Sequence, residues 1–296
     1  MPGSNARALE KARSLPADVV ILDLEDAVAP DAKVAARDAV CAAVRAGGFG
    51  AREVVIRVNG PVTPWGADDL AAAIEAGPDA ILLPKVESAE AVADADTALS
   101  DAPDRTRLWI MIETPLAILR LDAIAGAAQG RAGRQGDSRL ACLVLGTNDL
   151  AKETRARLVK GRAPMLPWIA TVVAAARAHG LDVLDGVFND LADPDGYRAE
   201  CEQGRDFGYD GKTLIHPKQL AVANEVFAPA PTEVEAARAI LAAFARPQNA
   251  GKGVISLEGR MVELLHAEMA ARTVAIAEAI AGRNEMNTNS TLSSLN

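Results

Sequence analysis

Short apolar runs alternate with longer amphipathic, alanine-rich stretches along most of this chain. The apolar runs predict buried β-strands at seven places: 17–23, 53–58, 80–84, 107–113, 141–147, 182–186 and 211–215. The stretches between them predict helices at 31–46, 67–76, 88–99, 116–128, 166–179 and 194–207. Strands and helices that alternate at this rhythm indicate a parallel sheet with right-handed crossovers, which places the chain in the α/β class.

Nearly every predicted strand ends in a charged or polar residue. These end positions are Asp23, Arg57, Lys85, Glu113, Asp149, Asp185 and His216. Functional side chains at the carboxyl ends of parallel strands are typical of a TIM or (β/α)8 barrel, whose active site is built on that face. Seven strands are one fewer than a closed barrel needs, so either the true start of the chain lies upstream of Met1 or the barrel is truncated at its first strand.

The pattern changes after the last predicted strand. We expect a helix at 217–227, a stiff proline-rich turn at 228–232, helices at 233–245 and 259–281, and between them a linker that can hold a short strand at 253–257. The chain is therefore divided into a barrel, 1–227, and a C-terminal helical segment, 228–282. A helix is also expected near 5–14. Residues 283–296 are expected to be disordered, and 129–139 to form a mobile surface insertion.

The composition of the chain excludes several classes of protein. The 296 residues are 50% hydrophobic, yet no apolar run is long enough to span a membrane and no secretory signal is visible. The cysteines Cys41, Cys142 and Cys201 have no paired spacing and read as reduced thiols of a cytoplasmic protein. The net charge of −9 argues against nucleic acid, but is compatible with a small anionic substrate held by local Arg and Lys. Dinucleotide, P-loop, zinc and serine-hydrolase motifs are absent.

Glu113 and Asp149 are the strongest candidates for chemistry. Each follows an apolar run, so both carboxylates are expected at the barrel mouth, where two such groups can hold one Mg²⁺ ion. Either residue alone can instead cap the next helix, because acidic side chains favour helix N-termini. Together with Arg57, whose guanidinium can bind a carboxylate or thioester oxygen, the pair favours a metal site. An ion pair from Arg57 to Glu25 or Asp26 is compatible with that role.

Other ionisable residues leave alternatives open. Lys85 and Lys212 follow strands and can form a Schiff base, but a role as partners of the acidic cluster is favoured. His216 can act as a general base or hold its loop in position. Glu263 lies outside the barrel, and its surroundings alone predict only an exposed helix carboxylate.

Seven short motifs follow one another in a fixed order along residues 1–282. They are Pro2-Gly3-Ser4-Asn5, Asp23-Leu24-Glu25-Asp26-Ala27-Val28, Arg57-Val58-Asn59-Gly60, Leu83-Pro84-Lys85, Ile112-Glu113-Thr114-Pro115, Gly146-Thr147-Asn148-Asp149-Leu150 and Gly211-Lys212-Thr213-Leu214-Ile215-His216-Pro217. Together they resemble the HpcH/HpaI aldolase and citrate lyase β-subunit family. Within it, the chain is similar to the CitE-like acyl-CoA lyases, which cleave malyl-CoA, methylmalyl-CoA or citramalyl-CoA.

The resemblance implies a Mg²⁺-dependent (β/α)8 barrel that forms a homotrimer or a multiple of trimers. Glu113 and Asp149 match the family's metal ligands, and Arg57 matches its substrate arginine. The positions that contact the CoA ester or the acid correspond to Lys11, Asn148, Ile215 and His216.

Two departures from the family's pattern are visible. Family members carry an Arg-Ser-x-Leu-Phe-like strand before Pro-Gly-Ser, which this chain lacks. Their C-terminal motif also reads Gly-x-Met-Ile-Asp, with the Asp reaching a neighbouring subunit's site as an acid or base. Glu263 stands at that position here, so a carboxylate is retained with one extra methylene.

The favoured reaction is the cleavage or formation of a carbon–carbon bond in a 3-hydroxy-3-carboxyacyl-CoA. The products of cleavage would be an acyl-CoA and a small α-keto acid, glyoxylate or pyruvate. Arg57 would stabilise the thioester enolate, and Glu263 of an adjacent chain would transfer its proton. The alternatives are a citrate lyase β-subunit acting on an acyl-carrier-protein thioester, a malyl-CoA thioesterase, and a non-catalytic barrel.

Overall fold

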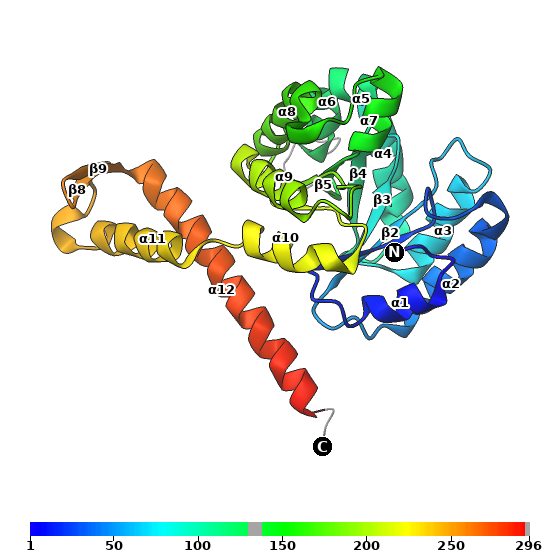
Figure 1. Ribbon diagram of the computed structural model, residues 1–296, viewed down its shortest axis with the longest axis horizontal. Coiled ribbons are helices and arrows are strands. Elements are labelled where there is room, and N and C mark those ends of the chain that lie inside the picture. The colour runs from blue at the N-terminus through cyan, green and yellow to red at the C-terminus, as the bar shows by residue number, and fades with distance from the viewer. Residues whose placement is uncertain (130–137, 294–296) are drawn as a thin grey trace. The chain divides into compact units, whose positions relative to one another are not determined.

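The computed structural model describes residues 1–129 and 138–293, of which 284–293 are given as backbone alone. Figure 1 shows the chain, which separates into two compact units, Met1–Asn224 and Glu225–Asn296. Most of the insertion predicted at 129–139 lies outside the described residues. In the described part, none of the helices has both the length and the apolar character that a membrane crossing requires.

The first unit is built on one parallel sheet of seven strands, whose order in space follows the order in the chain. The strands are β1 Val19–Asp23, β2 Glu53–Arg57, β3 Ala80–Leu83, β4 Arg107–Ile112, β5 Leu140–Leu145, β6 Asp182–Asp185 and β7 Gly211–Lys212. All seven predicted strands are present. β7 is shorter than predicted because the backbone N–H groups of Ile215 and His216 donate to the side chain of Gln219, at 3.0 and 3.1 Å, instead of joining the sheet.

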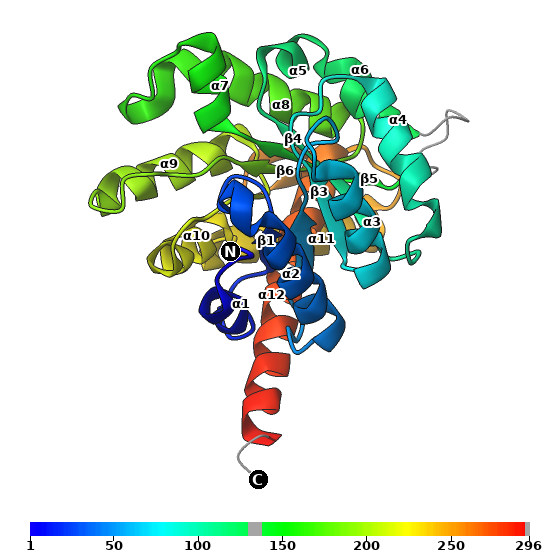
Figure 2. The ribbon, with the colours of Figure 1, turned by 90° about the vertical axis from the view of Figure 1, so that its right-hand side faces the viewer.

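Helices connect successive strands around the outside of the curled sheet (Figure 2), one further helix precedes β1, and another follows β7 in the chain. They are α1 Ala6–Ala12, α2 Lys33–Ala46, α3 Gly66–Ala76, α4 Ala89–Ala98, α5 Pro115–Leu119, α6 Leu121–Gly126, α7 Thr147–Thr154, α8 Leu166–Ala178, α9 Pro194–Phe207 and α10 Leu220–Phe227. The single helix predicted at 116–128 is two short helices that meet at Arg120. Helix α7 and a turn of 3₁₀-helix at Lys160–Met165 were not predicted.

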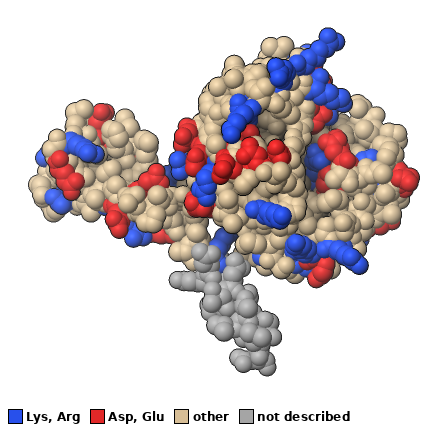
Figure 3. Space-filling model, in the orientation of Figure 1, with Lys and Arg blue, Asp and Glu red and all other residues tan. Residues whose placement is uncertain are grey.

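Side-chain oxygens fix where several helices begin. Ser88 accepts a hydrogen bond from the N–H of Ala91 at the start of α4, and Asp193 accepts from Gly196 at the start of α9. Figure 3 shows acidic side chains gathered over α9, where Asp195 and Asp206 are exposed. The side chains of Ser88 and Asp193 therefore mark the starts of α4 and α9 in the sequence.

The two faces of the sheet carry different residues. One face holds a cluster of alternating apolar residues from adjacent strands: Val55, Ala80, Leu82, Trp109, Met111, Cys142 and Val144. Residues of the opposite parity, such as Ile56, Ile81 and Leu143, are fully buried and are expected on the face covered by the helices. Burial on both faces explains the continuous apolar runs in the sequence.

The free edge of β1 is partly occupied by the start of the chain. Pro2 forms a parallel bridge with Asp23, and Gly3 donates a backbone hydrogen bond of 2.8 Å to the carbonyl of Asp23. A side chain on Gly3 would collide with that carbonyl and with Val40, its Cβ lying 2.7 Å from each, so glycine permits this close approach. Within the described residues, β1 and β7 are the two edges of the sheet, and an eight-stranded closed barrel is not seen.

The second unit contains helix α11 (Pro231–Phe244), an antiparallel hairpin of β8 (Val254–Leu257) and β9 (Arg260–Glu263), and helix α12 (Leu264–Ser293). Its apolar cluster is made by Ala243, Ile255 and Val262. The short strand expected at 253–257 is present, but the helix predicted from 259 begins only at Leu264 because residues 260–263 pair with β8. Helix α12 continues to Ser293, into the stretch for which no regular structure was predicted, and 294–296 lie outside the described residues.

Candidate functional site

Three charged side chains continue the inward-facing alternation at the carboxyl ends of the strands. Asp23, Arg57 and Glu113 each come two residues after an apolar residue of the inner face. In the register of the sheet, Asp23 is the direct neighbour of Arg57. The strands thus bring these residues, far apart in sequence, to one end of the sheet, as the sequence predicted for a site at this face.

Arg57 is held by carboxylates. Its Nε and Nη2 donate to the two oxygens of Asp23 at 2.6 and 2.7 Å, a bidentate pair, and its Nη1 lies 2.9 Å from Glu25 and 3.5 Å from Asp26. The predicted pairing of Arg57 with Glu25 and Asp26 is therefore present, but the main partner is Asp23. Burial raises the pKa of Asp23, yet the hydrogen bonds and charge of Arg57 outweigh it and hold that pKa below its ordinary value.

Glu25 is a poorly satisfied carboxylate beside this pair. Its buried Oε2 lies within ion-pair distance of Arg57 but has no hydrogen-bond partner. Burial, with the negative charges of Asp26 and Glu113 and against the attraction of Arg57, raises the pKa of Glu25 to about 7. The site therefore contains one carboxyl group that titrates near neutral pH.

The loop that carries Glu25 is held by Lys33 and Asn59, for which the sequence predicted no role in this loop. The buried ammonium of Lys33 donates to the carbonyls of Leu24 and Glu25, at 3.0 Å each, and Nδ2 of Asn59 donates to the Leu24 carbonyl at 2.8 Å. Asn59 is itself held by Asp69, whose Oδ2 is 2.6 Å from Nδ2. The sequence signals for Asn59 are its place just after a strand end and its place in the motif Arg57-Val58-Asn59-Gly60, whereas Lys33 carried none.

Glu113 and Asp149 converge on one cation, the side chain of Lys85. The Lys85 ammonium lies 3.6 Å from Glu113 Oε1 and forms a closer ion pair with Asp149. Glu113, only 1% exposed, also accepts a hydrogen bond of 2.8 Å from the backbone N–H of Lys85. Burial raises the pKa of Glu113, although the charge of Lys85 opposes the shift. The preferred role of Lys85, partner of the acidic cluster, is thus observed.

The competing capping explanation applies to only one of the two carboxylates. Thr114, and not Glu113, caps α5 by accepting from the N–H of Ala117 at 3.1 Å. Asp149 does lie in the first turn of α7. Gly146 leaves room for the site, because a Cβ at this position would lie 2.4 Å from the Cβ of Glu113. Glu113 is therefore buried at the strand end without a capping function.

The donor set fits a hard divalent cation. Two carboxylates already share one ammonium ion, so their oxygens can share one metal ion. Among the described residues no group of three or more His, Cys, Asp and Glu side chains is placed to hold a metal. Two protein carboxylates suit Mg²⁺, which completes its coordination with water and substrate oxygens.

The residues matched to CoA ester or acid contacts come from α1, from the start of α7 and from the loop after β7. Lys11 is exposed on α1. Asn148, next to Asp149, exchanges two side-chain hydrogen bonds with Asn189, at 2.7 and 3.3 Å. Ile215 is 51% exposed, and His216 caps the turn that follows it, its Nδ1 accepting from Lys218 N–H at 3.1 Å. This contact supports a positioning role for His216.

Glu263 is not a helix residue, contrary to the sequence-based prediction. It is the last residue of β9 and lies in the second unit, where its N–H donates to Nδ1 of His266 at 2.9 Å. The hairpin turn explains the difference, because Glu258 and Gly259 have left-handed backbone angles (φ 51° and 77°) that interrupt the helical pattern.

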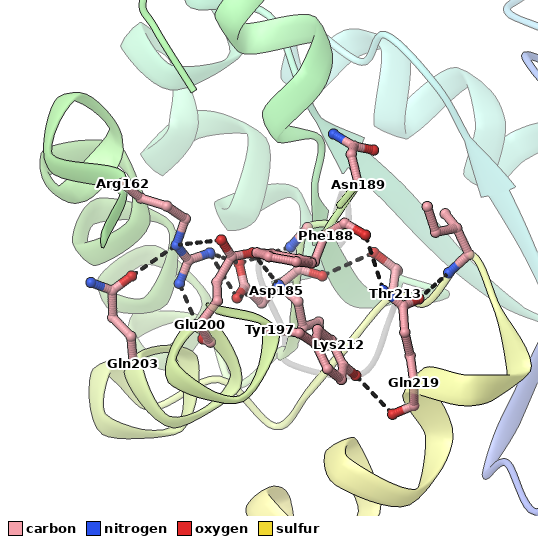
Figure 4. A network of polar contacts seen from close by, with 12 residues as sticks. Arg162, Asp185, Phe188, Asn189, Tyr197, Glu200, Gln203, Lys212, Thr213 and Gln219 are labelled. Atoms are coloured by element: carbon pink, nitrogen blue, oxygen red, sulfur yellow. Dashed lines mark hydrogen bonds and ion pairs between the residues drawn. The ribbon is translucent and has the colours of Figure 1, made fainter. Parts of the chain in front are cut away.

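A second charged cluster lies between β6, β7 and the outer helices (Figure 4). The Arg162 Nη1 donates to both oxygens of Asp185, at 2.7 and 2.8 Å, and the Lys212 ammonium contacts Asp185 at 3.0 Å and Glu200 at 2.8 Å. The side chains of Lys212 and Asp185 are fully buried. Lys212 is therefore a partner of carboxylates, as favoured, but of Asp185 and Glu200 in this second cluster and not of Glu113 and Asp149.

Comparison with known proteins shows to which family the chain belongs. The sequence profile of the HpcH/HpaI aldolase/citrate lyase family matches residues 1–217, which is most of the first unit. The chain belongs to this family. The resemblance drawn from the motifs is thereby confirmed.

Relatives with different activities match nearly the whole chain. It is 47% identical to a (3S)-malyl-CoA thioesterase of Cereibacter sphaeroides, covering 95% of this chain and 94% of that protein. It is 35% identical to an L-malyl-CoA/beta-methylmalyl-CoA lyase of the same species, covering 94% and 93%. A crystal structure of CitE from Mycobacterium tuberculosis, in complex with magnesium, acetoacetate and coenzyme A, is 29% identical, covers 93% of this chain and 96% of that chain, and superposes with a TM-score of 0.71.

Proposed function

We propose that this protein is a Mg²⁺-dependent thioesterase that hydrolyses a malyl-type CoA ester. The observation that carries the proposal is the identity of 47% to a (3S)-malyl-CoA thioesterase over nearly the full length, against 35% to a malyl-CoA lyase. The motifs alone favoured carbon–carbon cleavage and kept hydrolysis as an alternative. The higher identity to a thioesterase is the ground on which we now propose hydrolysis first.

In this proposal Glu113 and Asp149 hold the metal, as their shared contact with Lys85 supports. When bound, Mg²⁺ would act as a Lewis acid and template for the oxygens of the malyl unit. Arg57 supplies a fixed positive charge, because Asp23 engages two of its nitrogens and prevents the guanidinium from turning. A fixed cation stabilises the negative charge that develops on the thioester oxygen without having to reorganise.

The proposed hydrolysis forms a carbon–oxygen and a sulfur–hydrogen bond, and breaks the carbon–sulfur bond and one oxygen–hydrogen bond of water. The oxygen of a water molecule attacks the thioester carbonyl carbon, the carbon–sulfur bond breaks, and the CoA sulfur leaves to become a free thiol. Glu263 of a neighbouring subunit would accept the proton of the attacking water and pass it to the leaving sulfur. Lys11, Asn148, Ile215 and His216 would contact the CoA ester or hold the loops that do.

We also propose a homotrimer, which the resemblance to the family implies and in which Glu263 would reach the site of a neighbouring subunit. Apolar side chains near Glu263 are unusually exposed in the single chain: Met261, Leu264, Leu265 and Met269 are 70%, 52%, 49% and 65% exposed. Such a cluster indicates a surface that is covered in the assembly. The curled sheet supports a (β/α)8 barrel that is one strand short, with Met1–Gly3 beside β1 at the place of the missing strand. Light scattering on the purified protein tests the stoichiometry.

The test of the reaction is a product analysis of (3S)-malyl-CoA incubated with the protein and Mg²⁺. Hydrolysis releases malate and a thiol that reacts with a disulfide reagent, and no glyoxylate. Carbon–carbon cleavage instead releases glyoxylate and acetyl-CoA without free thiol. Glyoxylate in place of thiol would overturn hydrolysis in favour of the lyase, and no turnover of any malyl-, methylmalyl- or citramalyl-CoA would overturn both.

A further inference from the structure

Lys85 occupies an unusual position directly after β3. Its backbone is in the left-handed region, with φ of 55°, which residues other than glycine rarely adopt. This conformation goes with the 2.8 Å hydrogen bond from the Lys85 N–H to Glu113 Oε1. The same residue thus contacts Glu113 with both its backbone and its side chain, which ties the end of β3 to the end of β4.

The ammonium group of Lys85 neutralises two carboxylates that otherwise face each other. It is ion-paired with Asp149 and lies 3.6 Å from Glu113, whose side chain is 1% exposed. Two carboxylates so close together repel each other unless a cation lies between them. Lys85 therefore supplies the charge that a bound metal ion would otherwise supply.

We propose that Lys85 is a built-in counter-ion that competes with the divalent cation for Glu113 and Asp149. This inference rests on the proposed metal site. A divalent cation on the same oxygens would repel the ammonium, and the Lys85 side chain, 35% exposed and with a flexible four-carbon stem, can swing toward solvent. Lys85 keeps the two carboxylates together before the metal binds, and it lowers the affinity of the site for the metal.

The first test is Mg²⁺ binding by isothermal titration calorimetry to protein stripped of metal with EDTA. Removing the competing charge in Lys85→Met should tighten Mg²⁺ binding by about two- to fivefold, the upper part of the range for one partly exposed ion pair. Lys85→Arg, which keeps the charge, should stay close to the wild type. The matched control is Lys152→Met, because Lys152 is exposed on the same helix as Asp149. A merely structural role would predict weaker binding in Lys85→Met, and that result, or no change, would overturn the inference.

A second measurement uses the wild-type protein and does not depend on how the variants fold. An amine-acylating reagent is added with and without saturating Mg²⁺, and modification of each lysine is followed by mass spectrometry. Lys85 should react several-fold faster with Mg²⁺ present, while Lys152 reacts at the same rate. An unchanged ratio of the two rates overturns the displacement of Lys85. If wild-type protein binds no Mg²⁺, the metal site itself is refuted, which is a different result from equal binding by wild type and Lys85→Met.

Discussion

The buried cluster of Arg162, Asp185, Lys212 and Glu200 allows a sharp test of how this fold is stabilised. The side chains are 4%, 0%, 0% and 15% exposed, and two cations balance two carboxylates (Figure 4). We choose Arg162→Met, which removes the charge and the hydrogen bonds to Asp185 but keeps a long side chain. Arg162 has φ of 54°, and methionine has the same difficulty with that angle as arginine, so backbone strain is not altered.

The magnitude follows from what the substitution leaves behind. Without Arg162, Lys212 alone faces two carboxylates, one of them fully buried. Breaking a buried ion pair by removing one partner costs about 3–5 kcal/mol. The control is Arg205→Met, since Arg205 is exposed on α9 and its ion pair among the described residues is with the adjacent Asp206, at 3.2 Å. Its cost should stay below about 0.5 kcal/mol.

The assay is urea unfolding followed by tryptophan fluorescence. All the tryptophans, Trp65, Trp109 and Trp168, belong to the first unit, so the signal reports on the unit that contains the cluster. The double variant Arg162→Met/Asp185→Asn leaves Lys212 and Glu200 as a balanced pair, so its cost should fall short of the summed single costs by about 0.5–3 kcal/mol. A loss below about 1 kcal/mol for Arg162→Met, or strictly additive costs, would refute the reasoning.

Three further predictions concern the proposed site. Glu113→Gln or Asp149→Asn should abolish Mg²⁺-dependent turnover while the urea midpoint changes little, and activity that persists in EDTA would contradict the metal assignment. Gly146→Ala should impair turnover, because its Cβ would collide with Glu113, whereas Gly60→Ala, whose Cβ would meet no atom closer than 4.0 Å, should be tolerated; equal effects in turnover assays would argue against the clash. Glu263→Gln should lose about 10²–10⁴-fold in rate. Mixing it with inactive Arg57→Ala protein should restore partial activity after subunit exchange, and no recovery despite confirmed exchange would rule out catalysis across the subunit boundary.

The sequence predicted the strands and the end of the sheet where the charged residues meet. It succeeded there because strands buried on both faces are continuous apolar runs, and because parallel strands place their carboxyl ends at one edge. Asp23 was missed as the main partner of Arg57, although the pairing follows from the register, in which the two residues are neighbours. A single sequence shows where a strand ends more clearly than which residues lie side by side across two strands.

Other parts of the structure could not be predicted from local patterns. Gly161 and Arg162 have left-handed backbone angles inside a short polar turn, which no periodic pattern marks, so the buried role of Arg162 was not visible. The β8–β9 hairpin was partly hidden because the residues of β9 also fit a helical pattern. Arg162 is held by Asp185, which is distant in sequence, whereas the hairpin is set by pairing between neighbouring segments that competes with the helical preference.

Within this family, hydrolysis and carbon–carbon cleavage of a malyl-type CoA ester differ in the task of only a few side chains. Both reactions need the malyl unit oriented and negative charge stabilised on an oxygen, which Glu113, Asp149 and Arg57 can do for either. They differ in what happens next, because hydrolysis needs a base that activates water, whereas cleavage needs an acid that protonates an enolate carbon. Glu263 stands where the resemblance implies an aspartate, and its longer side chain would change the reach of that acid or base. In the proposed mechanism, the choice between the two reactions therefore depends on Glu263 more than on the residues that the sheet brings together.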